Sequence, residues 1–246
     1  MKTHIRVIVA STEDKARQIE DLKPYCNKET EVSLAKIETG PTCIESYFDE
    51  SLCVPGLIKA TLEAERDKVD AIVIESMGDT GIKSCREVTS IPIIGLGQTA
   101  FSIARNFGSK FSLITVAQKQ ATMLEEVIEN YGFNNSLQSI RNIDLRPLDI
   151  KDNQAVEKLL FKAAKDIIEV DNCSTIILAG SYFIGREKNL KQSLLKSGYH
   201  PLIIDPLPTA IRYAKFISEC GYTQNKMIYN APPYKEIIGY NLFQNA

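Results

Sequence analysis

The 246-residue chain is poor in the side chains that proteins commonly use to bind metals or to activate hydroxyl groups. It has two histidines, His4 and His200, about two hundred positions apart, and each adjoins a strand-like run. Its six cysteines form no C-x-x-C pair and no regular framework, which is typical of small buried hydrophobic residues in a reducing compartment. The sequence therefore argues against a metal site, a disulfide framework and a Ser-His-Asp or Cys-His triad.

Long apolar runs and a surplus of one charge are missing as well. No segment approaches the roughly 20 apolar residues that span a bilayer, and residues 1–10 are too short and too charged for a secretory signal. The net charge of −2 indicates neither a nucleic-acid partner nor a membrane surface. With 44% hydrophobic and 24% charged residues, the composition is that of a globular protein, and we expect a cytoplasmic location.

Short runs rich in valine and isoleucine alternate with helical patterns along the chain. Seven runs have the length and composition of buried parallel strands: 5–10, 32–37, 71–74, 91–95, 111–115, 175–178 and 201–204. Between them, apolar residues at 123–131 and 155–168 recur with a helical period, and Gly132 is placed to end the first of these helices. Ser11 and Asp14 are candidates to cap the first helix. The alternation predicts an α/β fold with parallel sheets covered on both faces.

The chain also resembles itself. Residues 72–76 match 176–180 at an offset of 104 positions, and residues 99–105 match 209–215 at an offset of 110. Two matching units predict a duplication with pseudo-twofold symmetry, although any two βαβ units look somewhat alike. We expect a first lobe of residues 1–98 plus 213–246, a second lobe of residues 99–212, and a ligand cleft between them, beyond the carboxyl ends of the strands.

Three segments carry a resemblance to a known family. They are Gly40-Pro41-Thr42-Cys43-Ile44-Glu45-Ser46 with Phe48-Asp49-Glu50, then Gly78-Asp79-Thr80-Gly81 after a strand, and finally 221–226 leading to Tyr229-Asn230-Ala231-Pro232-Pro233. In this order and spacing the chain resembles the hydantoin racemase branch of the aspartate/glutamate racemase superfamily. The resemblance implies two Rossmann-like lobes, no cofactor, a small carboxylate or imide as ligand, and a homo-oligomer. Members racemise hydantoins, allantoin, aspartate or glutamate, and some relatives isomerise maleate or decarboxylate arylmalonates.

The resemblance also implies a position for two catalytic thiols. In the racemases one cysteine of each lobe faces the substrate's α-carbon, one removing a proton and the other returning one, and a thiol suits this work because its pKa of about 8.5 is readily lowered. Here the two positions are Ser76 and Gly180, or Ser181 after a one-residue slip. None of these residues supplies a thiol. We therefore expect no two-thiol racemisation of the family's substrates.

Candidate site residues follow from these positions. Ser76 is either a catalytic or ligand-binding hydroxyl or an inert strand end, and Glu75 is either a general base or one partner of a salt bridge across the lobe interface. Tyr182 is the best-placed replacement acid in the second lobe. The candidate substrate-binding residues are Ser11, Met77, Gly78, Thr115, Gly180 and Ser181. Asp79 is expected to cap the following helix rather than to do chemistry, and Cys43 and Cys85 are relocated thiols or buried spectators.

Three functions remain open on the sequence. The first is a cofactor-independent isomerase of this superfamily acting on a small carboxylate or imide by a non-thiol mechanism. The second is cleavage of a C–C or C–N bond on the same fold, with hydroxyls and amides stabilising an oxyanion. The third is a protein that binds such a ligand without turning it over.

Overall fold

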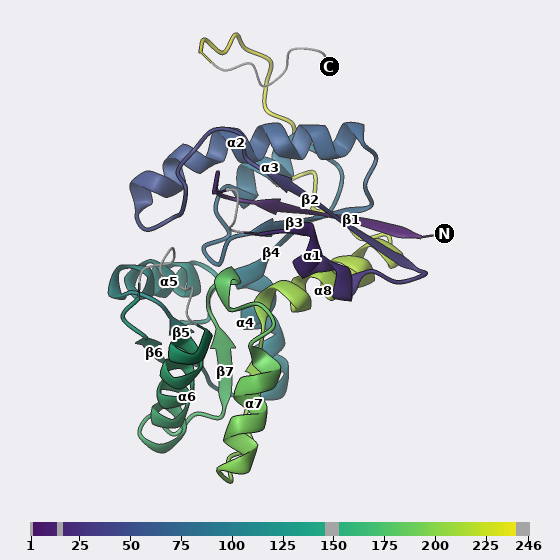
Figure 1. The fold of residues 1–246 in the computed structure, drawn as a ribbon. Helices are drawn as coiled ribbons and strands as arrows, with labels where there is room; N and C mark the ends of the chain where they lie inside the picture. Colours follow the sequence, from purple (N-terminus) through teal and green to yellow (C-terminus); the bar gives the residue numbers. More distant parts are fainter. Residues whose placement is uncertain (1, 14–16, 146–152, 240–246) are drawn as a thin grey trace. The chain divides into compact units, whose positions relative to one another are not determined.

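The structure is a computed structural model, and it describes residues 2–13, 17–145 and 153–239. Its strands form two four-stranded parallel sheets with the same order, β2-β1-β3-β4 and β6-β5-β7-β8 (Figure 1). The strands are β1 (Thr3–Val9), β2 (Thr30–Lys36), β3 (Ala71–Glu75), β4 (Ile93–Gly95), β5 (Phe111–Thr115), β6 (Leu137–Asn142), β7 (Thr175–Leu178) and β8 (Leu202–Ile204). The α/β architecture of two similar parallel-sheet lobes is thereby confirmed.

Helices connect the strands in both halves. They are α1 (Ile19–Leu22), α2 (Tyr47–Arg66), α3 (Ile82–Val88), α4 (Leu96–Phe107), α5 (Gln118–Asn130), α6 (Asn153–Glu169), α7 (Glu187–Lys196) and α8 (Pro206–Glu219), with short 3₁₀ turns η1 (Lys23–Tyr25), η2 (Asn134–Ser136) and η4 (Ser181–Phe183). The chain divides into two compact units: residues 1–75, 80–95 and 211–246 form the first, and residues 76–79 and 96–210 form the second. No helix in the described ranges has both the length and the hydrophobicity that a bilayer crossing requires.

The first unit is built on the sheet β2-β1-β3-β4. Apolar side chains of α2 and α3, among them Leu57 and Ile82, pack against Ile8, Ile72 and Ile74 of the strands. The three strand residues belong to short runs with high β propensity. These runs show no polar alternation because the strands are buried on both faces of the sheet. Figure 1 shows α1 and the end of α8 on the opposite face from α2 and α3.

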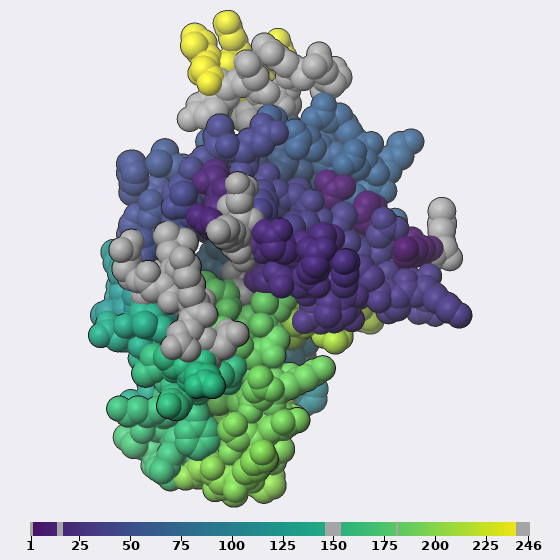
Figure 2. Space-filling view, viewed as in Figure 1, coloured from purple at the N-terminus to yellow at the C-terminus, as the bar shows by residue number. Residues whose placement is uncertain are grey.

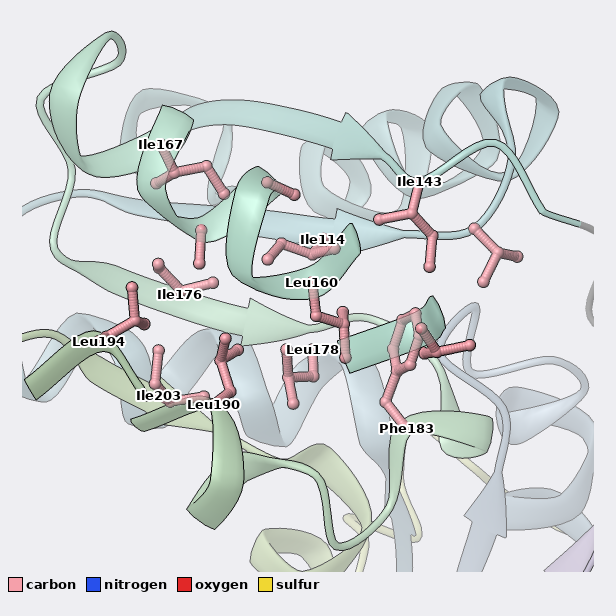
Figure 3. Close-up of a cluster of buried hydrophobic side chains, with 14 of the residues drawn as sticks. Ile114, Ile143, Leu160, Ile167, Ile176, Leu178, Phe183, Leu190, Leu194 and Ile203 are labelled. Carbon is pink, nitrogen blue, oxygen red and sulfur yellow. The ribbon is translucent and has the colours of Figure 1, made fainter. Parts of the chain in front are cut away.

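The second unit repeats this arrangement. On one face, Leu160 and Ile167 of α6 and Leu190 of α7 pack against Ile114 and Ile176, as Figure 3 shows. On the other face, Phe101 of α4 stacks on Phe111 of β5 with ring centroids 5.6 Å apart, and Phe133 meets both rings edge-on. The apolar residues that recur with a helical period at 155–168 therefore do form the buried face of a helix, α6.

Local features depart from expectation at two places. The strand β6 was not predicted, because its sequence Leu137-Gln138-Ser139-Ile140-Arg141-Asn142 is polar; it lies at the edge of its sheet, where most of its side chains are only half-buried. The first helix begins at Ile19 after Gln18, so the prediction that Ser11 caps it is wrong; Asp14 lies outside the described residues. Gly132 does follow the end of α5 with φ of +75°, as predicted.

Candidate functional site

The strand order fixes where a ligand site is expected in each unit. In the order 2-1-3-4, consecutive connections leave in opposite directions from the first and third strands, and ligands of open α/β sheets bind at the carboxyl ends of such a pair. In the first sheet these ends are Ser11 after β1 and Glu75 in β3; in the second they are Thr115 in β5 and Gly180 after β7. The candidate residues therefore lie at the switch points of the two sheets.

Glu75 is held by a buried ion pair. Its carboxylate accepts hydrogen bonds from Arg17 Nε at 3.1 Å and 3.3 Å and from Nη2 at 2.9 Å, and the two side chains are only 3% and 2% exposed. Arg17 also donates to Asp21 Oδ2 at 3.1 Å. Burial opposes the charge of Arg17, but the two carboxylates outweigh it and raise the guanidinium pKa. Both partners belong to the first unit, so the ion pair does not cross the lobe interface.

The Gly-Pro segment packs beside the loop after β1. Thr12 donates its backbone N–H to Pro41 O at 3.0 Å and its hydroxyl to the same oxygen at 3.2 Å. Gly40 has φ of +145°, and a Cβ there would lie 2.7 Å from Ile37 Cδ1, so the turn favours glycine. Ser11, in the same loop, is 8% exposed. The segment thus shapes the carboxyl end of β1.

The cysteines near the strands are poor candidates for relocated catalytic thiols. Burial, followed by the charges of Asp49 and Glu50, raises the pKa of the Cys53 thiol to about 12. Burial also raises the pKa of Cys85 to about 11, although the Thr61 hydroxyl lowers it in part. Since the thiolate is the reactive form, both groups are inert near neutral pH. Cys43 is half-buried and its thiol donates to Glu45 at 3.4 Å.

Residues 76–79 are anchored to the second unit by Asp79. Its carboxylate accepts the backbone N–H groups of Gly97 and Gln98, each at 2.8 Å, and the hydroxyl of Tyr131 at 2.9 Å. Asp79 therefore caps α4, and the prediction that it caps the following helix α3 is wrong; the N-cap of α3 is Gly81. The anchor holds the half-buried Ser76 and Gly78 and the buried Met77 in a turn after β3.

A Cβ built on Gly97 would lie 2.5 Å from the backbone oxygen of Met77. Real side-chain carbons do not approach a backbone oxygen so closely, which explains a glycine at this helix start. The close approach of α4 to residues 76–79 therefore depends on both Asp79 and Gly97.

Thr115, Gln120 and Tyr182 form a polar cluster at the carboxyl end of the second sheet. The Tyr182 hydroxyl donates to Gln120 Oε1 at 3.0 Å, and the buried Thr115 hydroxyl donates to the same oxygen at 3.4 Å. The Tyr182 ring lies over Gly180, where a built Cβ would be 2.1 Å from its Cε2 atom and 2.4 Å from its Cζ atom. The tyrosine therefore fills the space of a side chain at position 180.

An open groove of about 550 Å³ adjoins this cluster in the second unit. Tyr182, Ile184 and Gly185 line it from the turn after β7, together with Arg186 and Asn189 of the following segment and Gln154, Glu157 and Lys158 of α6. Arg186 pairs with Glu157 at 3.3 Å, and Gly185 N–H donates to Asp205 Oδ2 at 2.8 Å. The groove gives Tyr182 a solvent-accessible, polar neighbourhood. Ser181 belongs to the same turn, η4.

Two residues of the site region, Arg17 and Gln120, were not predicted from the sequence. Arg17 had a signal, because a carboxylate inside a buried strand requires a cation, and the loop after the adjacent strand supplies one. Gln120 had none beyond its place in the first turn of the helix after β5. Within the described ranges, no three His, Cys, Asp or Glu side chains are grouped to hold a metal ion. The cluster at the end of the second sheet offers two hydroxyls and an amide, which suit a carbonyl or carboxylate.

Comparison with known proteins agrees with this architecture. Residues 7–214 match the model of the Asp/Glu/Hydantoin racemase family. The chain is 30% identical over 219 residues to a hydantoin racemase from Pseudomonas sp. (strain NS671), covering 88% of this chain and 86% of that protein. It is also 30% identical over 215 residues to a hydantoin racemase from Rhizobium meliloti, covering 87% of each.

Among solved structures, an allantoin racemase from Klebsiella pneumoniae superposes with a TM-score of 0.88 at 22% identity. The superposition covers 98% of both chains and therefore supports the same fold from end to end. On the family match and the 30% identities, this chain belongs to the Asp/Glu/hydantoin racemase family.

Proposed function

We propose that this protein is a cofactor-independent enzyme that transfers a proton at the carbon beside a carbonyl of a small carboxylate or cyclic imide, without a two-thiol mechanism. The relatives named hydantoin racemase support the substrate class. The observation that carries the mechanism is the hydroxyl and amide cluster of Thr115, Gln120 and Tyr182, which stands at the switch point where the family resemblance implies a thiol.

The roles we assign follow the placement of the side chains. Ser76, half-buried after β3, is proposed to contact the ligand, with Met77 and Gly78 shaping the same turn. Gly180 and Ser181 are proposed to line the turn after β7, and Ser11 the loop after β1. The Thr115 hydroxyl is directed at Gln120, and we propose that it orients the amide toward the ligand. Glu75 is committed to Arg17, and we assign it to structure rather than to proton transfer.

The reducing cytoplasm is the proposed location. All six cysteines lie in the described part of the chain, and none forms a disulfide, which suits a reducing compartment.

Proton exchange with deuterated water tests the proposed reaction directly. We expect the protein to replace the α-proton of at least one 5-substituted hydantoin, allantoin, aspartate or glutamate with deuterium faster than buffer does, as followed by ¹H NMR. Binding of these ligands without exchange would identify a ligand-binding protein instead. The proposal would be contradicted if the protein neither bound any of these ligands nor exchanged their α-proton.

A variant at Ser76 tests the assigned contact. Loss of a hydrogen bond to a charged group costs about 1.5–3 kcal/mol, so Ser76→Ala should weaken ligand binding by roughly tenfold or more in a titration. Ser102→Ala is the matched control, since that residue is exposed on α4 and its hydroxyl donates to Gln98 O of the same helix at 2.8 Å. Equal binding by Ser76→Ala and the wild type would remove Ser76 from the site.

A further inference from the structure

Tyr182 occupies the volume that any other residue at position 180 would need. The distances of 2.1 Å and 2.4 Å from a built Cβ to Cε2 and Cζ are far below van der Waals contact. The hydroxyl is one bond from Cζ, so it also lies within a few ångströms of that position. Because Gly180 is buried and the tyrosine is half-buried, the phenol brings a titratable oxygen to the carboxyl end of β7.

Packing alone does not account for this hydroxyl. The ring already has an apolar contact, with Phe183 at 5.0 Å in an edge-on arrangement, which a phenylalanine would keep. The hydroxyl instead points to Gln120, from the helix after β5, and shares its oxygen with Thr115. An amide has an acceptor and a donor end, so Gln120 can accept from the phenol and, after rotation, donate to the phenolate. Gln120 therefore suits both protonation states as a positioning residue.

The groove beside Tyr182 offers a ligand access to it. Its titratable groups other than Tyr182 are Glu157 and Lys158 of α6 and Arg186 before α7, which gives two cations against one carboxylate. Arg186 and Glu157 form an ion pair. This balance favours an anionic or carbonyl-rich ligand over a cation.

We propose that Tyr182 is the proton-transferring residue of the second unit and that it works on one face of the ligand. Its phenolate takes the proton from the carbon beside the carbonyl, and the electron pair of that C–H bond moves into the carbonyl as an enolate. The phenol then exchanges its proton with water and returns one to the same carbon from the same side. No oxidant, reductant or metal is consumed.

This inference rests on the proposed function and narrows it. A single group on one side returns hydrogen to the face from which it took it, so the product is the same enantiomer carrying solvent hydrogen. The structure thus assigns exchange with retention of configuration rather than racemisation. One enantiomer of each ligand should exchange and its mirror image should not.

The experiment compares Tyr182→Phe with the wild type and with Tyr199→Phe. Tyr182→Phe keeps the ring over Gly180 and removes only the hydroxyl. Tyr199→Phe is matched, because Tyr199 packs on the core of the same unit and its hydroxyl bonds Glu169, but it precedes β8 at the opposite end of the sheet. The exchange of each separate enantiomer is followed by NMR and chiral chromatography, and it is measured at several pH values between 6 and 10. Ligand affinity is measured by titration.

General acid–base groups contribute about 10²–10⁴-fold, so Tyr182→Phe should lose at least 100-fold in exchange while its affinity stays within about threefold and Tyr199→Phe behaves as the wild type. Because the proposed base is the phenolate, the wild-type rate should rise with pH, and this rise should be missing from the residual rate of Tyr182→Phe. Undiminished exchange in Tyr182→Phe, or inversion by the wild type, overturns the role of Tyr182 and leaves the proposed function standing. No exchange by the wild type overturns both.

Discussion

At the scale of single residues, Glu75 and Arg17 form a buried ion pair in the first unit. The guanidinium contacts both oxygens of Glu75 and also Asp21. Breaking a buried pair by removing one partner costs about 3–5 kcal/mol, because the remaining charge stays uncompensated. We therefore expect Arg17→Met to lower the free energy of unfolding by about that amount in a urea titration.

The double variant Arg17→Met/Glu75→Leu separates the ion pair from the packing of its side chains. With both charges removed, no uncompensated charge remains, and the double variant should be more stable than Arg17→Met alone. A double variant that is less stable than the single one would show that Glu75 contributes through something other than this pair.

At this scale the sequence indicated candidate site positions, but it did not indicate the directions in which their side chains point. Ser76 and Gly180 were candidates because the resemblance implies thiols there, Tyr182 because it lies close after Gly180, and Thr115 because it ends a strand. That the Tyr182 ring turns back over Gly180 depends on the path of the turn η4, which no spacing in the sequence encodes. The same holds for Asp79, whose carboxylate reaches α4 from a backbone with φ of +49°.

At the scale of elements, the start of α4 depends on Asp79. Loss of an N-cap side chain costs about 0.5–2 kcal/mol, and alanine adds strain at φ of +49°. Asp79→Ala should therefore lower the free energy of unfolding by about 1–2 kcal/mol, and Asp79→Gly by less, since glycine tolerates this conformation. Urea unfolding measures both.

Asp144→Ala is the matched control for the strain alone, because Asp144 has φ of +55° and is exposed in a loop. It should cost less than Asp79→Ala. If the two alanine variants were equally destabilised, the capping role of Asp79 would be ruled out.

The edge strand β6 is held by a pair whose strength depends on pH. Arg141 donates to both carboxylate oxygens of Asp171 at 2.7 Å, and the Ser139 hydroxyl donates to Asp171 Oδ2 at 2.7 Å. The hydrogen bonds from Arg141 lower the pKa of Asp171 below 3.8, against the effect of burial. A lowered carboxyl pKa gives stability that is present above the unfolded value and lost as pH falls through the folded value.

Asp171→Asn should therefore be less stable than the wild type near neutral pH, and the difference should shrink as pH falls below about 3.8. Unfolding free energies from urea titrations between pH 3 and 7 measure this. A difference that stays constant over the whole range would contradict the assignment of this stability to the Arg141 pair.

At the scale of the whole molecule, the duplication was the most readable feature of the sequence. The matches at offsets of 104 and 110 positions correspond to two sheets with the same strand order. Periodicity identified seven of the eight strands that lie in the described part of the chain, because buried parallel strands are continuous apolar runs. The eighth, β6, lies at an edge where polar residues are tolerated, so its composition gave no signal.

The C-terminal segment exposes several large apolar side chains. Gln224 and Lys226 bond backbone oxygens of Thr89 and nearby residues of the first unit, but Met227, Tyr234 and Ile238 are 93%, 102% and 87% exposed. Figure 2 shows the last described residues, in yellow, at the surface. The sequence 237–243 forms an apolar-containing tail, which we expect to cover its own lobe or a neighbouring subunit, and its residues 240–243 lie outside the described residues. Exposed apolar patches of this kind mark interaction surfaces, so we expect a homo-oligomer.

Light scattering after size exclusion tests this expectation. The full chain should have a mass that is a multiple of 27.5 kDa at micromolar concentration, and a chain that ends at Asn230 should form a smaller species. The truncation keeps Tyr229, whose ring contacts Arg86. A monomeric full chain would contradict the prediction.

Alkylation of the cysteines tests the proposal that this family member transfers protons without a thiol. Iodoacetamide near neutral pH should modify Cys26 and Cys220, which are exposed, and the half-buried Cys43. Cys53 and Cys85 should stay unmodified because burial raises their pKa to about 12 and about 11. With modification verified by mass spectrometry, we expect an unchanged rate of α-proton exchange. A rate that falls in proportion to the alkylation of any cysteine would contradict it.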